Sequence, residues 1–89
     1  MAVVLVEEGR IGKRFYKVFK HTAAGADTAT LNHGFATVST VHHTVIHAAA
    51  TADTVEDVLV RQNGVNIESV IGAAGQPLID SVFIKISGF

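Results

Sequence analysis

Histidine is the residue type in this 89-residue chain with the clearest capacity for chemistry, and three of the five histidines lie in the segment TVHHTVIH, Thr40–His47. In a strand, His43 and His47 share one face but lie about 13 Å apart, because each residue advances the chain by about 3.3 Å. A Zn²⁺ ion holds each imidazole nitrogen at about 2.0–2.1 Å, so one ion cannot bind both side chains. The spacing predicts ordinary strand histidines, with His42 on the opposite face, and no metal ligands or cofactor.

A helix would place His43 and His47 one turn apart, where they could chelate a metal. The segment lacks the glutamate of the H-E-x-x-H pattern, and its threonines and valines disfavour a helix. A metal held between chains, with one histidine from each, is a further alternative, as is a role in pH sensing.

The serines offer no recognisable nucleophile. Ser39, Ser69, Ser81 and Ser87 all lie in strand-like segments, and none occupies a G-x-S-x-G elbow. The acidic residues form no obvious inward pair for acid/base work, and a chain this short has little room for a closed pocket. We therefore expect no catalytic residues and no enzymatic activity. The enzymatic alternative is a small metal-dependent enzyme that uses His42, His43 or His47.

Basic and aromatic residues are concentrated near the N-terminus. Five of the seven basic residues fall in RIGKRFYKVFK, Arg10–Lys20, although the net charge of the whole chain is −1. A solvated strand is the simplest interpretation of such alternation. As a functional surface, the segment fits docking on an acidic protein better than binding of single-stranded nucleic acid through Phe15, Tyr16 and Phe19. The predicted partner-binding residues are Arg10, Lys13, Arg14, Phe15, Lys17 and Lys20.

The elements that must position these side chains are predicted to be strands. Valine and threonine suit strands, and the recurring turn signals favour an all-β fold, a small sandwich or barrel of about six to eight strands. Residues 1–89 would form a single β domain with a thin core, because a chain of this length buries only about 60–65% of its unfolded surface. With no cysteine for a disulfide and 48% hydrophobic residues, we expect apolar surface to be covered in a homo-oligomer. The alternative is a plain monomer with a self-sufficient core.

The N-terminal strands can be predicted in more than one way. Ala2–Val6 fits a strand that is buried on both faces or donated to a neighbouring subunit, and Glu7–Gly9 would end it. Ile11–His21 fits a strand with Arg14, Tyr16, Val18 and Lys20 on one face. The alternative is a helix with a stripe formed by Ile11, Phe15, Val18 and Phe19.

Three further strands are expected, at Thr28–Leu31, Ala36–Ala48 and Leu78–Phe89. In the last of these, Val82, Ile84 and Ile86 would share one face, and Phe83, Lys85 and Ser87 the other.

Asn63-Gly64 gives the clearest local signal, because Asn-Gly between alternating runs predicts a hairpin with a two-residue turn. This turn would pair Gln62 with Val65 and Val60 with Ile67. The apolar face would then comprise Val58, Val60, Val65, Ile67 and Ile71. The polar face would carry Asp57, Arg61, Asn66 and Glu68.

No stretch approaches the roughly 18 apolar residues that a membrane helix needs. The N-terminus also lacks the positive region of a secretory signal. We expect a protein that folds in a cytoplasm and has no membrane partner.

The segment DTATLNHGFATVSTV, Asp27–Val41, resembles a recurring element of small β-rich virion proteins of tailed bacteriophages. That element reads T-x-T-x-x-H-G-[LF] and continues into a strand rich in valine and threonine. The opening IGKRFYKVFKHT is also similar to such proteins. Fibre-associated versions continue with glycine and proline, where this chain has Ala36-Thr37-Val38. The matching residues are Thr28, Thr30, His33, Gly34 and Phe35.

The resemblance implies a structural role in the virion. The expected function is that of a capsid decoration (cement) protein, which binds the outer shell and staples capsomers. Its partner would be the major capsid protein or another virion protein, and it would form a homo-oligomer, with a trimer favoured. It would be found in the virion, assembled in the host cytoplasm. A tail, fibre or head-appendage component is the alternative within this class.

Overall fold

The computed structural model describes residues 3–22, 26–47, 58–72 and 79–89, and within these ranges the chain forms seven strands and no helix. The strands are β1 (Val3–Ile11), β2 (Arg14–Thr22), β3 (Asp27–Leu31), β4 (Val38–His47), β5 (Val58–Asn63), β6 (Asn66–Ile71) and β7 (Ile79–Gly88). The predicted all-β class is confirmed. Ala2, Ala48, Asp57 and Leu78, which the expected strands included, lie outside the described residues. The described residues include no helix capable of crossing a membrane.

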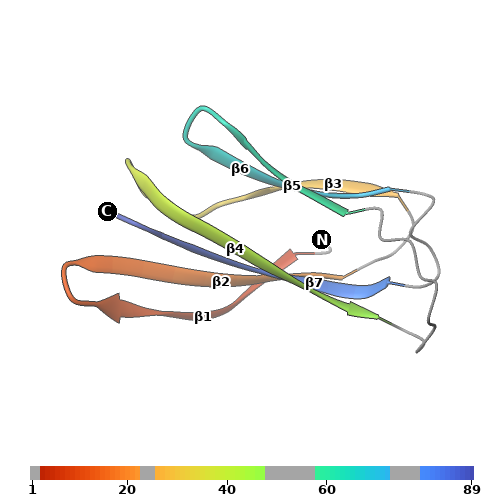
Figure 1. Ribbon diagram of the computed structural model, residues 1–89, viewed down its shortest axis with the longest axis horizontal. Coiled ribbons are helices and arrows are strands. Elements are labelled where there is room, and N and C mark those ends of the chain that lie inside the picture. Colours follow the sequence, from red (N-terminus) through yellow and green to blue (C-terminus); the bar gives the residue numbers. More distant parts are fainter. Residues whose placement is uncertain (1–2, 23–25, 48–57, 73–78) are drawn as a thin grey trace.

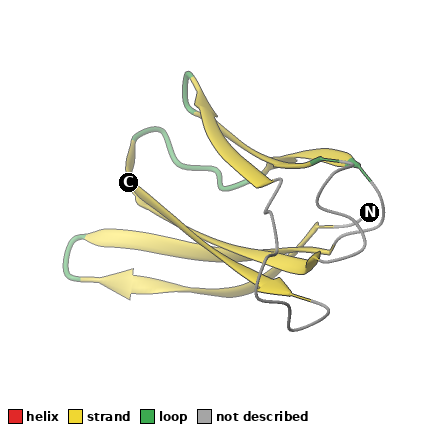
Figure 2. Ribbon diagram, turned by 45° about the vertical axis from the view of Figure 1, so that its right-hand side comes forward, coloured by secondary structure: helices red, strands yellow, loops and turns green. Residues whose placement is uncertain are grey.

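The strands form two antiparallel sheets, which lie one above the other (Figures 1 and 2). The four-stranded sheet has the order β1-β2-β7-β4, and the three-stranded sheet has the order β3-β6-β5. Each sheet therefore has one face toward the other sheet and one face away from it, as in a sandwich. These are called the inner and outer faces below.

The core lies between the two sheets and is built on β7. Val82, Ile84 and Ile86 are completely buried there, so the predicted apolar row of this strand is confirmed. The row is covered because β7 pairs with β2 on one side and with β4 on the other, while the second sheet packs above it. The other buried apolar side chains are Phe19, Leu31, Ile67, Ile71 and Ile79.

The first hairpin differs from the sequence prediction. β1 does not end at Glu7–Gly9 but continues to Ile11, which pairs with Arg14 across a Gly12-Lys13 turn. Gly12 has a φ of +61°, and glycine at the first of two turn residues is typical of a type II′ hairpin turn. Arg14–Thr22 is then strand β2, so the strand interpretation of this segment holds and the helix alternative is wrong.

β1 forms an edge of the four-stranded sheet, and its predicted burial on both faces is wrong. Val4, Leu5 and Val6 are 53%, 46% and 48% exposed in the single chain. The register of β1 against β2 shifts between Leu5 and Glu7, which makes Val6 the extra residue of a β-bulge.

The second hairpin is present, but its turn lies one residue later than predicted. Asn63 pairs with Asn66 across Gly64-Val65, and Arg61 lies opposite Glu68, with 2.8 Å between Arg61 Nε and Glu68 Oε1. Gly64 has a φ of +64°, whereas every described non-glycine residue has a negative φ. A type I′ Asn-Gly turn needs positive φ at both central residues, so this turn also fits type II′.

The shift leaves the faces of this hairpin as predicted, because each residue changes its partner by two positions and the side-chain period is two. Val58, Val60, Ile67 and Ile71 belong to the core cluster or pack against it. Val65 is the exception, since it lies in the turn and is 44% exposed.

The turn type can be tested with Asn63→Val. In the observed register Asn63 is a strand residue, so valine should change the free energy of unfolding by less than about 0.5 kcal/mol. In a type I′ turn a valine at positive φ would cost about 1–2 kcal/mol. Gly64→Val is the matched control and should cost at least that much. Urea unfolding of both variants measures the difference, and a large loss in Asn63→Val would contradict the register.

Candidate functional site

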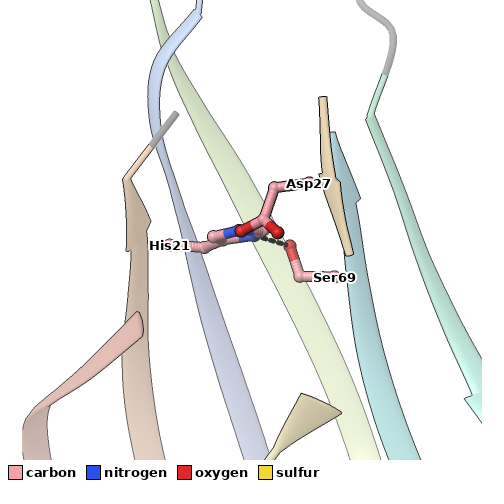
Figure 3. Close-up of polar contacts among 3 residues, drawn as sticks. All are labelled: His21, Asp27 and Ser69. Atoms are coloured by element: carbon pink, nitrogen blue, oxygen red, sulfur yellow. Dashed lines mark hydrogen bonds and ion pairs between the residues drawn. The ribbon is translucent and has the colours of Figure 1, made fainter. Parts of the chain in front are cut away.

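A serine, a histidine and an aspartate meet between the two sheets (Figure 3). His21 on β2 lies with Nδ1 2.7 Å from Ser69 Oγ on β6 and with Nε2 2.8 Å from Asp27 Oδ2 on β3. An ionised Asp27 can only accept, so His21 carries a proton on Nε2 and donates it to the carboxylate. These three residue types also make up the catalytic triad of serine hydrolases.

Burial argues against a catalytic role for this cluster. His21 and Ser69 are both 0% exposed, so a substrate carbonyl has no access to Ser69 Oγ in this structure. The ring is also reversed relative to an acyl-transfer triad, in which serine contacts Nε2 and aspartate contacts Nδ1. The cluster instead joins three strands of two sheets by one buried and one partly buried hydrogen bond, and we name it the inter-sheet polar contact.

Sequence reasoning missed the inter-sheet polar contact, although part of the signal was present. His21 shares the inner face of β2 with Phe19, two residues earlier. Ser69 falls between Ile67 and Ile71, both on the predicted apolar face of the second hairpin, so the same alternation places its side chain inward. Two polar side chains at inward positions need partners. The identity of those partners depends on how the two sheets stack, and the alternation of residues within one strand does not determine the stacking.

His33 is the second buried histidine among the described residues, and its contacts account for the central residues of the segment Asp27–Val41. Its Nδ1 accepts the Phe35 backbone N–H at 2.8 Å, so Nε2 carries the ring proton and donates to the Val65 carbonyl at 2.8 Å. The Phe35 ring stacks on the imidazole at 5.4 Å, and Gly34 between them has a φ of +74°. His33, Gly34 and Phe35 therefore have a structural role, tying the connection before β4 to the β5–β6 turn.

The three histidines of β4 alternate between the two faces of the sheet. His42 pairs with Lys85 on the outer face, while His43 pairs with Ile84 on the inner face and is still exposed at the sheet edge. His47 pairs with Ile79 beyond a register shift. In the part of the chain that the structure describes, no three His, Asp or Glu side chains are grouped as metal ligands would be.

The predicted partner-binding residues divide between two faces. Arg14 and Lys20 point outward from β2. Lys17 points inward, where its Nζ donates to the His33 carbonyl at 2.7 Å and lies 5.5 Å from the centre of the Phe35 ring. Arg10 and Phe15 are also on the inner face, with the guanidinium 6.0 Å from the ring centre. Lys13 is exposed in the β1–β2 turn.

β7 contributes residues to the outer face that the prediction did not include. Lys20 Nζ lies 5.9 Å from the centre of the Phe83 ring, and Lys85 Nζ lies 4.8 Å from the centre of the Tyr16 ring. Each pair joins β2 to β7, and the rings hold the ammonium groups by cation–π attraction. We name this surface the outer cationic face. Its members are Arg14, Tyr16, Lys20, His42, Phe83 and Lys85.

A shallow hollow of about 190 Å³ lies at one end of the outer cationic face. Arg14, Lys85 and His42 surround it with hydrogen-bond donors that can face an anion. Tyr16 forms one wall and donates from its hydroxyl to Glu7 Oε1 at 3.4 Å. The ring can lie across β1 because residue 9 is glycine, where a Cβ would approach the Tyr16 hydroxyl to 2.6 Å. The remaining lining residues are Ile11, Phe15, Thr40 and Ser87.

The charge of this face is positive. Arg14, Lys20 and Lys85 provide three positive charges. The described carboxylates do not cancel this charge. Asp27 and Glu68 belong to the other sheet, and Glu8 points to the inner face. Only Glu7 and Asp80 remain among the described acidic side chains of the four-stranded sheet. The geometry suits contact with carboxylates or phosphates, through charge and through aromatic surface.

The fold and this face define the class of the protein: a small antiparallel β-sandwich with a cationic, aromatic surface on its larger sheet. Comparison with known protein families, with curated proteins and with solved structures gives no match to the chain.

The inter-sheet polar contact can be tested with Ser69→Ala. The substitution leaves His21 Nδ1 buried without its partner, which should lower the free energy of unfolding by about 1–3 kcal/mol. Chemical denaturation followed by circular dichroism measures the loss. Ser39→Ala, at an exposed position of β4, is the matched control and should change the stability by less than about 0.5 kcal/mol. Equal stability of the two variants would contradict the structural role of Ser69.

Proposed function

We propose that the chain is a structural protein of a bacteriophage virion that decorates the capsid by binding its outer shell and stapling adjacent capsomers. The observation that carries the binding role is the outer cationic face, where lysines from two strands are held over aromatic rings. The assignment to a virion is supported by the resemblance of Asp27–Val41 to small phage proteins.

The face would act through binding energy alone. Tyr16, Val18 and Phe83 are half-buried in the free chain, so a partner that covers them removes further apolar surface from water. Lys20 and Lys85 lie beside this apolar strip and would pair with carboxylates of the partner. The cations confer specificity for an acidic surface and speed the encounter, while the aromatic side chains contribute most of the affinity.

Stapling requires that more than one copy of the face bind at once. A homo-oligomer, with a trimer favoured, would present several outer cationic faces to neighbouring capsomers. Each further contact then forms at a high effective concentration, which raises the overall affinity without any new kind of interaction. The same surface could instead bind a tail, fibre or head-appendage protein, which is the alternative within this class.

Single-stranded nucleic-acid binding is the second candidate, because a sheet face with aromatic residues and lysines is typical of such proteins. The set proposed from sequence, Phe15, Tyr16 and Phe19, does not form one surface. Phe19 is 4% exposed in the core, Phe15 points inward, and Tyr16 points outward. On the outer cationic face, Lys85 and Lys20 lie over Tyr16 and Phe83, where a base would have to stack. The geometry therefore favours a protein partner.

The location of the protein tests the proposal directly. Density-gradient-purified particles of the encoding virus should contain the chain at a constant ratio to the major shell protein. Gold-labelled antibody should mark the heads in electron micrographs. Label on the tail would favour the tail or fibre alternative, and absence of the chain from purified particles would refute the virion assignment.

The binding face is tested by Lys85→Glu. Reversing this charge should weaken binding to purified shells that lack the protein roughly ten-fold or more, which corresponds to about 1.4 kcal/mol. Lys13→Glu makes the same change of charge in the exposed β1–β2 turn and should bind as the unmodified chain does. Co-sedimentation measures both variants. A dodecamer of deoxythymidine, titrated at low salt and followed by fluorescence anisotropy, should show no binding to the unmodified chain.

A further inference from the structure

The two edge strands of the four-stranded sheet differ in character. β1 and β4 each pair with one neighbour among the described strands, so each has a side along which main-chain hydrogen-bonding groups can pair with another strand. β1 exposes the apolar residues Val4, Leu5 and Val6, followed by Glu7 and Glu8. β4 exposes Ile46, which is 42% accessible, together with His42 and His43. One edge is apolar and acidic, and the other is apolar and carries imidazoles.

The directions of the strands allow the two edges to meet. All neighbours in the order β1-β2-β7-β4 are antiparallel, so β1 and β4 run in opposite directions. If a second copy continues the sheet in the same orientation, its β1 lies beside β4 of the first copy and runs antiparallel to it. The strands have similar lengths, nine and ten residues, so one can cover most of the other.

One register matches the side chains on both faces of the extended sheet. With Leu5 opposite Val45 on the inner face, Val4 lies opposite Ile46 on the outer face. Both pairs are apolar. The face of the sheet on which each residue lies is known from its cross-strand partner in β2 or β7. The bulge residue Val6 shifts the register by one, which brings Glu8 opposite His43 on the inner face. In this register the Glu8 carboxylate of one copy faces the His43 imidazole of the next.

Symmetrical pairing of like edges is less favourable. Two β1 strands paired about their midpoint would place Glu7 opposite Glu7 and Glu8 opposite Val6. Like charges directly opposite each other destabilise a strand pair, as does a charge against an apolar side chain at a buried contact. Glu7 and Glu8 thus disfavour this β1–β1 contact, and β4, the edge strand that carries His42 and His43, is the better partner for β1.

We propose that this chain assembles head to tail with further copies of itself, through main-chain pairing of β1 of one copy with β4 of the next. Such a contact uses a different surface on each partner, so it closes as a ring or continues as a filament, depending on the rotation between copies. The exposed Val4 and Leu5 would be covered by the neighbour's Ile46 and Val45. This contact is independent of the outer cationic face and of the partner that the face binds.

The experiment uses two lysine variants, Val4→Lys and Ile46→Lys, each of which blocks one edge with a charge. Light scattering over a concentration series should show oligomers for the unmodified chain and monomers for each variant alone. An equimolar mixture of the two variants should give dimers, because β1 of Ile46→Lys and β4 of Val4→Lys are both intact. Val65→Lys, at a turn residue with a similar exposed fraction, is the matched control and should remain oligomeric.

Several outcomes would overturn the proposal. A monomeric unmodified chain would exclude the contact. Oligomers of Ile46→Lys together with monomers of Val4→Lys would indicate a symmetrical β1–β1 contact instead. Monomeric variants that form no dimer on mixing would mean that neither edge binds the other. Should a lysine variant lose the far-ultraviolet circular dichroism of the unmodified chain, Val4→Thr and Ile46→Thr replace the pair, because threonine keeps the β-branched shape.

The docking variant separates this proposal from the proposed function. Lys85→Glu should remain oligomeric, because Lys85 lies on the interior strand β7, which has no open main-chain edge and takes no part in the β1–β4 pairing. Oligomers that do not bind shells would contradict the docking face alone. Monomers that bind shells would contradict the head-to-tail contact alone.

Discussion

The alternation of side chains along β7 is the constraint on which the rest of the structure depends. β7 lies between β2 and β4, so its inner row of Val82, Ile84 and Ile86 is enclosed from three sides and completely buried. The outer row has the same two neighbours but no covering sheet. Because one backbone holds both rows, close packing inside fixes the spacing of Phe83 and Lys85 outside. An ordered cationic face is therefore a direct result of a well-packed core.

The inter-sheet polar contact shows why residue identity is not enough to define a catalytic site. Ser69, His21 and Asp27 have hydrogen-bond distances that a hydrolase would need, yet the hydroxyl has no route to solvent. In a thin sandwich, the same bonds have a structural use. They fix which strand of one sheet lies above which strand of the other, a relation that apolar packing alone specifies weakly because apolar contacts are not directional.

Properties that depend on a two-residue period could be predicted from the sequence, and properties that depend on distant strands could not. The inward rows of β7 and of the second hairpin followed from alternation alone. The two hairpin turns could not be placed by this period. Asn63-Gly64 suggests a type I′ turn one residue before the observed one, and Glu7–Gly9 suggests an end to β1 before Ile11. Lys85 was assigned to its correct face, but its position over Tyr16 depends on β2 pairing with β7, which are separated by most of the chain.

The place of β7 in the sheet also has a consequence for the order in which the protein can fold. The β1–β2 and β5–β6 hairpins join neighbouring segments and can form early, because little chain entropy is lost in closing them. β2 and β4 cannot be joined until β7 is available, and β7 follows all the other described strands in sequence. Such long-range pairing slows folding. Until it occurs, β2 and β4 each present an additional open edge, so aggregation competes with folding most strongly just before the central strand is inserted.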